Sequence, residues 1–236
     1  MSQQYACINC KNPVHHLYQK YPNLTKLAKC DKCHEIVDKY IEFHHLIALV
    51  DVILLSNKAY RHIIYNAEFK MHWKLYLILL LLESFALWRQ KLEKFATKSL
   101  QVGELNVPED FFQEKGFYMC CLENLIDSVV LFIILAGLSK IIRASSKRKS
   151  NFLSYLIKAV ILGNFSKIFL LPILVWRDNT TELDSNFHYF VVKFYYVFSC
   201  SNVYSSITNL NLYKSSAVVV LAFFIKKYFM VLFNFL

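Results

Sequence analysis

Apolar residues are distributed unevenly along the chain, with long runs beyond about residue 70 and only short stretches before it. A helix needs about 20 predominantly apolar residues to cross the ~30 Å hydrocarbon core of a bilayer. The runs therefore predict a multi-span transmembrane region over residues 72–236 with about four to five helices. The expected spans are about 73–91, 122–142, 152–176, 187–207 and 216–236.

Residues 1–66 carry a different pattern. The nearly continuous apolar run from Ile47 to Leu55 is too short to cross a bilayer. It predicts amphipathic helices within residues 36–66 that lie along the membrane surface. Residues 5–35 contain short apolar or aromatic stretches separated by prolines, and we expect short β-strands there.

The composition agrees with a helical membrane protein. The chain is 56% hydrophobic and 16% aromatic, but only 4 of its 236 residues are glycine. Average usage of glycine is roughly 7%, so turn-rich β folds and glycine-loop nucleotide enzymes are disfavoured. Catalytic motifs such as Gly-x-Ser-x-Gly and His-Glu-x-x-His are absent from the sequence. The expected fold class is mainly α, in a membrane protein without enzyme activity.

The net charge of +10 comes from basic residues that mostly border the apolar runs. This placement favours contact with anionic lipid over binding of nucleic acid. Residues 1–74 contain ten Lys and Arg and residues 140–150 contain five, whereas residues 89–116 hold five basic and five acidic residues. The positive-inside rule then places the N-terminus in the cytosol. The first residues lack the apolar segment of a secretory signal peptide, so we expect insertion through an internal span.

Four of the seven cysteines are arranged as Cys-x2-Cys, nineteen intervening residues, and Cys-x2-Cys: Cys7, Cys10, Cys30 and Cys33. Two such turns can present four sulfurs to one ion at the corners of a tetrahedron, as in zinc ribbons. The spacing predicts a zinc ribbon over residues 5–35 with a structural zinc, because four thiolates leave no open position on the metal. Two disulfides are the alternative, and they require an oxidising compartment.

The N-terminal residues also resemble a known family. The order Cys7-Ile-Asn-Cys10, Cys30-Asp-Lys-Cys33, Val37-Asp-Lys-Tyr-Ile-Glu42, Leu49-Val-Asp51-Val-Ile-Leu54, Ala59-Tyr-Arg-His62 and Asn66 is similar to the Arv homology domain. The resemblance covers roughly residues 5–66, so residues 1–66 are taken as that domain. We expect five of its residues to contact the membrane surface or a partner, namely Asp51, Tyr60, Arg61, His62 and Asn66.

The resemblance implies a function in lipid homeostasis. Arv family proteins (ACAT-related proteins required for viability) are endoplasmic-reticulum membrane proteins implicated in sterol homeostasis. The implied role is sterol uptake, trafficking and distribution into membranes, with linked roles in sphingolipid metabolism and delivery of early glycosylphosphatidylinositol (GPI) intermediates. The expected partners are these lipids and no nucleic acid, and the Golgi membrane is a second expected location. The alternative is a zinc-module adaptor or accessory subunit of a polytopic glycosyltransferase, such as a GPI mannosyltransferase.

Charged residues inside the expected spans are costly and need an explanation. Glu123 and Asp127 lie four residues apart on one helical face. They suggest either an intramembrane proton or cation site, or a position at the head-group boundary. Glu83 and Lys193 are expected to snorkel or to pair between helices.

Overall fold

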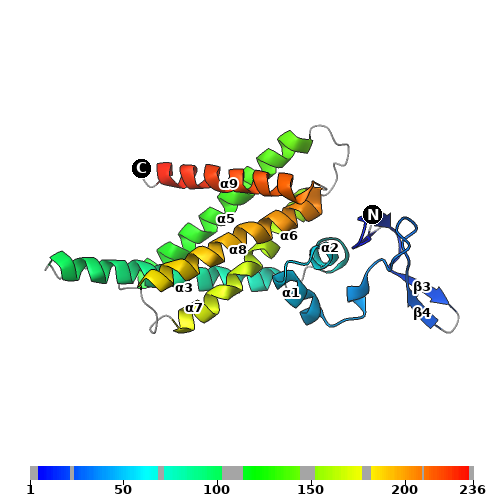
Figure 1. Cartoon of the computed structure of the whole chain (residues 1–236), viewed down its shortest axis with the longest axis horizontal. Helices are drawn as coiled ribbons and strands as arrows, with labels where there is room; N and C mark the ends of the chain where they lie inside the picture. Colours follow the sequence, from blue (N-terminus) through cyan, green and yellow to red (C-terminus); the bar gives the residue numbers. More distant parts are fainter. Residues whose placement is uncertain are drawn as a thin grey trace.

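The computed structural model describes residues 5–21, 24–68, 72–102, 114–143, 152–176, 182–208 and 210–233. Figure 1 shows a small N-terminal module, coloured blue to cyan, at one end of the molecule and long helices filling the rest. We call residues 5–66 the module and residues 72–233 the helical body. The expected mainly helical fold is confirmed.

The module begins with two short hairpins. Strand β1 (Tyr5–Ala6) pairs antiparallel with β2 (Pro13–Val14). Strand β3 (Tyr18–Tyr21) pairs antiparallel with β4 (Leu24–Leu27), with Tyr18 opposite Leu27. The short strands expected upstream of residue 35 are therefore present.

Short helices complete the module: η1 (Lys39–Ile41), α1 (His45–Ile53), α2 (Asn57–Arg61) and the π-helical turn η2 (His62–Asn66). Helix α1 carries apolar residues on both its buried and its exposed side. It buries Ala48 and Val52 and exposes an apolar face that includes Leu46 and Val50. The turn from α1 to α2 passes through Leu55, which has a positive φ of 61°.

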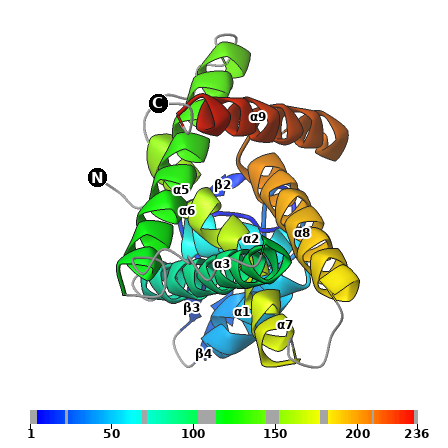
Figure 2. The same ribbon diagram turned by 90° about the vertical axis from the view of Figure 1, so that its left-hand side faces the viewer.

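The body consists of α3 (His72–Val102), α5 (Glu114–Arg143), α6 (Phe152–Gly163), η3 (Asn164–Phe169), α7 (Leu170–Trp176), α8 (Glu182–Thr208) and α9 (Leu212–Phe233). Helix α6 contacts α3, α5 and α8. Figure 2 shows it between α5 and α8, with α9 crossing above them. These contacts make α6 the centre of the body.

Three helical segments in the described residues are long and apolar enough to cross a membrane: 114–142, 152–176 and 212–232. They correspond to three of the five expected spans. The other two expected spans, 73–91 and 187–207, form helices α3 and α8 but do not belong to this set. Charged residues in the second half of α3 and the many Ser and Tyr residues of α8 lower their hydropathy.

The segment 152–176 is interrupted by the 3-10 turn η3, which separates α6 from α7. The side chain of Asn164 donates to the carbonyl of Val160 (2.7 Å), and Ser166 donates to the carbonyl of Gly163 (2.8 Å). Such side-chain hydrogen bonds compete with regular helical pairing. The same place is a close approach, because a Cβ on Gly163 would lie 2.8 Å from Cys200 Sγ on α8.

The module and the body share one hydrophobic core. Buried residues of the module, among them Ile8, Val52 and Ile63, form one cluster with Leu162 of α6 and Val203 of α8. The hydroxyl of Tyr195 on α8 also donates to the carbonyl of Ile53 at the end of α1. The cysteine-containing module is thus packed directly against helices of the body.

Candidate functional site

The four N-terminal cysteines converge at the tips of two turns. Their sulfur atoms all lie within 4.8 Å of one another. The closest pairs join the two turns, with 3.7 Å between the sulfurs of Cys7 and Cys33 and 3.6 Å between those of Cys10 and Cys30. Cys7 and Cys30 are buried, while Cys10 and Cys33 are half-buried.

The two turns have the same construction. The N–H of Cys7 donates to the carbonyl of Asn12, and the N–H of Lys11 donates back to the carbonyl of Cys7 (both 2.9 Å). In the second turn, the Cys30 N–H donates to Glu35 (2.9 Å) and the His34 N–H donates to Cys30 (2.8 Å). Lys11 and His34 occupy equivalent positions with positive φ values of 61° and 59°. The repeated backbone geometry directs both cysteines of each pair to a common point.

This arrangement fits a tetrahedral metal. Four sulfurs at about 2.3 Å from one ion would be about 3.8 Å apart, close to the distances between the paired sulfurs. A disulfide needs its sulfurs about 2.05 Å apart, and all seven cysteines are free in the structure. The four side chains can therefore hold a metal ion, and the disulfide alternative does not match the structure. His15, His16 and His34 lie outside the cluster of ligand atoms.

The protein alone does not favour four ionised thiols. Burial raises the pKa of Cys7 to about 12. At Cys30 burial also acts to raise the pKa, but hydrogen bonds from the N–H groups of Cys33 and Lys32 and from neighbouring thiols lower it to about 7. A bound cation would supply the charge that stabilises the remaining thiolates, and its binding would release protons.

A buried carboxylate connects the start of the module to its last turn. Asp38 Oδ2 lies 2.6 Å from His62 Nδ1 and accepts a hydrogen bond from Asn66 Nδ2, also at 2.6 Å. Its Oδ1 accepts the N–H of Tyr40 (3.0 Å) and so caps η1. The Asn66 amide also bonds both the N–H and the carbonyl of Ala6 (2.9 Å each). Asp38 thus joins η1 to η2, and Asn66 extends this network to β1.

Two basic side chains fasten the first cysteine turn. Arg61 Nη1 donates to the carbonyls of Ile8 (2.7 Å) and Asn9 (2.6 Å), which lie between Cys7 and Cys10. Lys11 Nζ donates to the carbonyl of Ser205 on α8 (2.9 Å). Burial and then the nearby Arg61 charge lower the pKa of Lys11 to about 8. The cysteine turn is thereby tied both to α2 and to the body.

The five residues expected to contact the membrane surface or a partner all have hydrogen-bond partners within the protein, and two of them are buried. Tyr60 is 0% exposed and His62 is 6% exposed. The Tyr60 hydroxyl donates to the carbonyl of Val52 (2.9 Å) and lies 3.2 Å from Ser199 Oγ. Asp51 accepts a hydrogen bond from Tyr40 (2.7 Å), and burial together with this bond raises the pKa of Tyr40 to about 12. Together with Arg61 and Asn66, these residues hold the module together through hydrogen bonds within the protein.

The residues that carried the sequence resemblance are therefore the ones that build and dock the cysteine turns. A family model described as the Arv1-like family matches residues 6–200, a range that includes the module and most of the body. The chain belongs to the Arv1-like family. No solved structure shows a significant match to it.

Named relatives of this Arv1-like chain come from distant organisms. It is 35% identical over 190 residues to Protein ARV1 of Bos taurus, covering 77% of this chain and 63% of the relative. It is 32% identical over 188 residues to Protein ARV1 of Homo sapiens, covering 77% of this chain and 66% of the relative. Protein ARV 2 of Arabidopsis thaliana is 29% identical over 181 residues, with 73% of this chain and 72% of the relative covered. The chain thus spans less than two-thirds of the length of the bovine and human proteins.

The body of this Arv1-like protein contains three lysine–carboxylate pairs among its described residues. Glu123 pairs with Lys91 of α3 (2.6 Å), and Asp127 pairs with Lys226 of α9 (2.7 Å). The two carboxylates of α5 therefore have separate lysine partners on different helices. Glu83 pairs with Lys167 of η3 (2.6 Å), as expected for pairing between helices. The lysine partners were not assigned from sequence, because their spacing gives no sign of which helices meet.

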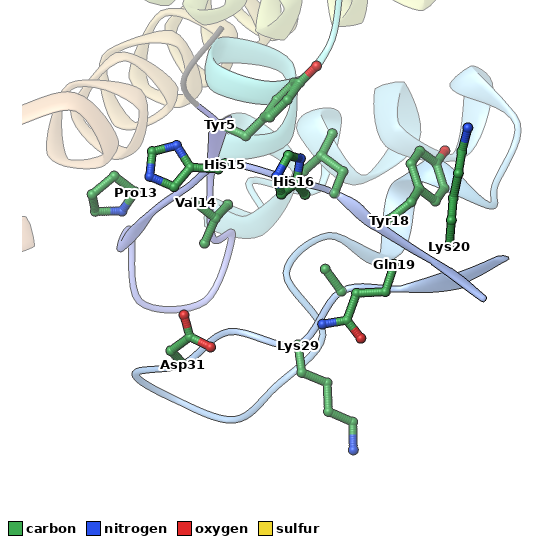
Figure 3. Close-up of a pocket in the computed structure, with 12 residues that line it drawn as sticks. Tyr5, Pro13, Val14, His15, His16, Tyr18, Gln19, Lys20, Lys29 and Asp31 are labelled. Carbon is green, nitrogen blue, oxygen red and sulfur yellow. The ribbon is translucent and has the colours of Figure 1, made fainter. Parts of the chain in front are cut away.

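The module also carries an open groove of about 880 Å³ (Figure 3). In this view His15 and His16 lie together on the segment that leads into β3, and Tyr18 and Lys20 point to the same side of that strand. Lys29 and Asp31 line the groove from the other cysteine turn. The groove is rich in imidazole, ammonium and phenol groups and lies beside the cysteine cluster on the same module. Sequence reasoning missed it because its walls come from two separate segments.

Proposed function

We propose that this chain acts in sterol homeostasis at the endoplasmic-reticulum membrane. Its role would be in sterol uptake, trafficking and distribution into membranes, with linked effects on sphingolipid metabolism and on delivery of early GPI intermediates. The observation that carries the proposal is the Arv1-like match over residues 6–200, which includes both the module and most of the membrane-type helices. The proposed action is transport or presentation of lipid without covalent chemistry.

The module is proposed to hold one structural zinc ion through Cys7, Cys10, Cys30 and Cys33. Support comes from the sulfur distances of 3.6–3.7 Å between the two turns and from the matching backbone hydrogen bonds in each turn. The zinc would stabilise the turns that Arg61 and Lys11 hold against the rest of the protein. The zinc would therefore affect lipids only indirectly, by stabilising the fold of the module.

The chain is proposed to be a multi-pass protein of the endoplasmic-reticulum membrane, and also of the Golgi membrane, with its N-terminus in the cytosol. The three apolar helices and the basic residues that flank the runs support this placement. The reducing cytosol keeps thiols available for metal, in agreement with the seven free cysteines.

A second candidate function is that of an adaptor whose module docks a membrane glycosyltransferase, such as a GPI mannosyltransferase. The groove lined by His15, His16, Tyr18 and Lys20 favours it, because it is a large open surface on the module. In that case the effect of the protein on lipids would be indirect.

Reconstitution of the purified chain separates the two functions. Donor liposomes with the protein and a fluorescent sterol would be mixed with acceptor liposomes, and the rate of sterol transfer would be compared with protein-free liposomes. We expect faster, saturable transfer with the protein. No acceleration, together with stable co-purification of a glycosyltransferase from native membranes, would overturn the transport function in favour of the adaptor.

A further inference from the structure

A small cavity lies between α3, η3, α7 and α8, separate from the cysteine cluster. Its volume is about 50 Å³. Apolar side chains form part of its wall, including Ala86, Leu170 and Val192, and the polar side chains of Glu83, Lys167 and Lys193 form another part. An apolar pocket with a few converging polar groups is the usual form of a small-molecule site.

The Glu83–Lys167 pair gives this cavity a defined chemistry. Lys167 is only 5% exposed, its Nζ lies 2.6 Å from Glu83 Oε2, and it sits 4.5 Å from the centre of the Tyr196 ring. The lysine is therefore enclosed by a carboxylate and an aromatic face. The Glu83 side chain keeps 24% of its surface accessible. Since a carboxylate can accept about four hydrogen bonds, Glu83 has capacity for a donor that enters the cavity.

The cavity favours a small neutral head group. The cavity volume of about 50 Å³ exceeds the ~10–15 Å³ that one bound water needs, so a hydroxyl group fits in it. Lys167 and Lys193 also line the cavity, but Glu83 already neutralises Lys167 at 2.6 Å, so a phosphate would have to compete with the Glu83 carboxylate and would be repelled by it. A hydroxyl can donate to Glu83 without this penalty.

The surroundings of the cavity suit a hydrocarbon tail. Phe190, the neighbour of the lining residue Tyr189, is 65% exposed on α8. Leu171, the neighbour of Leu170, is exposed on α7. Apolar side chains are thus exposed on α7 and α8, two of the helices that line the cavity, and the apolar body of a lipid could lie against these helices.

We propose that this cavity binds the hydroxyl head of a neutral membrane lipid. Glu83 accepts a hydrogen bond from the hydroxyl, and the ion pair with Lys167 holds the Glu83 side chain in place. This inference rests on the proposed lipid function and locates the site at which the lipid is held. Sterols, diacylglycerols and ceramides share the required chemistry, namely a hydroxyl group on an apolar body.

The test uses the full-length chain in lipid nanodiscs with photoreactive sterol, diacylglycerol and ceramide, each carrying a free hydroxyl. We expect saturable labelling by at least one of these lipids. The lipid that binds most tightly identifies the class of ligand. Glu83→Gln should weaken that binding about tenfold, the typical effect of losing a hydrogen bond to a charged group. A methyl ether of the same lipid cannot donate this hydrogen bond. It should therefore bind the parent chain about as weakly as the hydroxyl lipid binds Glu83→Gln.

Two further variants keep the test independent of folding. Glu123→Gln removes the carboxylate that pairs with Lys91 between α3 and α5, outside the cavity lining, and should bind like the parent chain. Ala86→Leu fills the cavity while the ion pair stays intact, and it should also weaken binding. Thermal unfolding in detergent would show whether each variant is folded.

Each outcome separates the site from the proposed function. Equal binding of the hydroxyl lipid by the parent chain, Glu83→Gln and Ala86→Leu would overturn the site, even if sterol transfer between liposomes persists. Equal binding of the methyl ether would overturn the role of Glu83 as acceptor. Loss of binding in both cavity variants without any sterol transfer by the parent chain would support the site and overturn the transport function.

Discussion

Asp38 is the residue on which the module's polar contacts converge. Its carboxylate accepts hydrogen bonds from the Tyr40 N–H and the Asn66 amide and lies 2.6 Å from His62 Nδ1. The side chain of Asp38 is fully buried. Loss of this carboxylate would leave the Tyr40 N–H, the Asn66 amide and His62 Nδ1 without this partner.

Replacement of Asp38 by alanine is therefore expected to destabilise the protein by about 3 kcal/mol, because buried donors lose their partner. Thermal unfolding of the purified chain in detergent, followed by circular dichroism, would measure this change. Asp31→Ala is the matched control, since Asp31 is exposed on the same module and its loss should change stability by less than about 0.5 kcal/mol. A similar melting temperature for both variants would show that Asp38 does not organise the module.

Helix α6 illustrates how one small residue sets the distance between elements. Gly163 ends α6 where α8 passes, and a Cβ there would meet Cys200 Sγ at 2.8 Å. Gly137 of α5 has nothing within 4 Å of an added Cβ. The two glycines therefore have different roles, although both lie in apolar helical sequence.

Gly163→Ala is expected to cost about 1–3 kcal/mol, because α6 and α8 must separate or distort. Cys200→Ala removes the sulfur, so the same glycine substitution should cost less in that background. A double-mutant cycle built from thermal unfolding measures this coupling. Gly137→Ala should be neutral or slightly stabilising. Additive effects of Gly163→Ala and Cys200→Ala would contradict the close approach.

At the scale of the whole molecule, the cysteine turns and the membrane-type helices form one structure. Arg61 holds the first turn against α2, Lys11 holds it against α8, and Ile8 from the same turn enters the shared core. A change in the metal site should therefore alter the packing of the body. It would not do so if the module were joined to the body only by a flexible linker.

The double substitution Cys7→Ser and Cys30→Ser is expected to abolish metal binding and to lower the melting temperature of the whole chain. Emission spectroscopy would measure zinc per protein, and limited proteolysis would report unfolding of the module. Cys121→Ser is the control, because Cys121 lies on α5 outside the cluster. Unchanged zinc content in the double variant would disprove the four-cysteine site.

The sequence alone determined the class of the protein and the position of its metal-type site. Apolar runs long enough to cross a bilayer and two Cys-x2-Cys pairs are local features, and local geometry decides what they form. The spacing within each pair dictates a turn, so the clustered sulfurs and the short strands around them could be predicted. The order of motifs around Cys7, Cys33, Asp51 and His62 was enough to indicate the family.

Tertiary structure decided which partners the polar residues have and how the module and the body pack together. Lys11 bonds Ser205, 194 positions away, and Lys167 bonds Glu83, 84 positions away. No local pattern reports such partners, because they depend on which helices pack together. For the same reason no local pattern indicates that Tyr60 is buried beside Ser199 of α8 or that His62 is buried beside Asp38. The hydroxyl-sized cavity beside Glu83 likewise exists only because four segments far apart in sequence meet there.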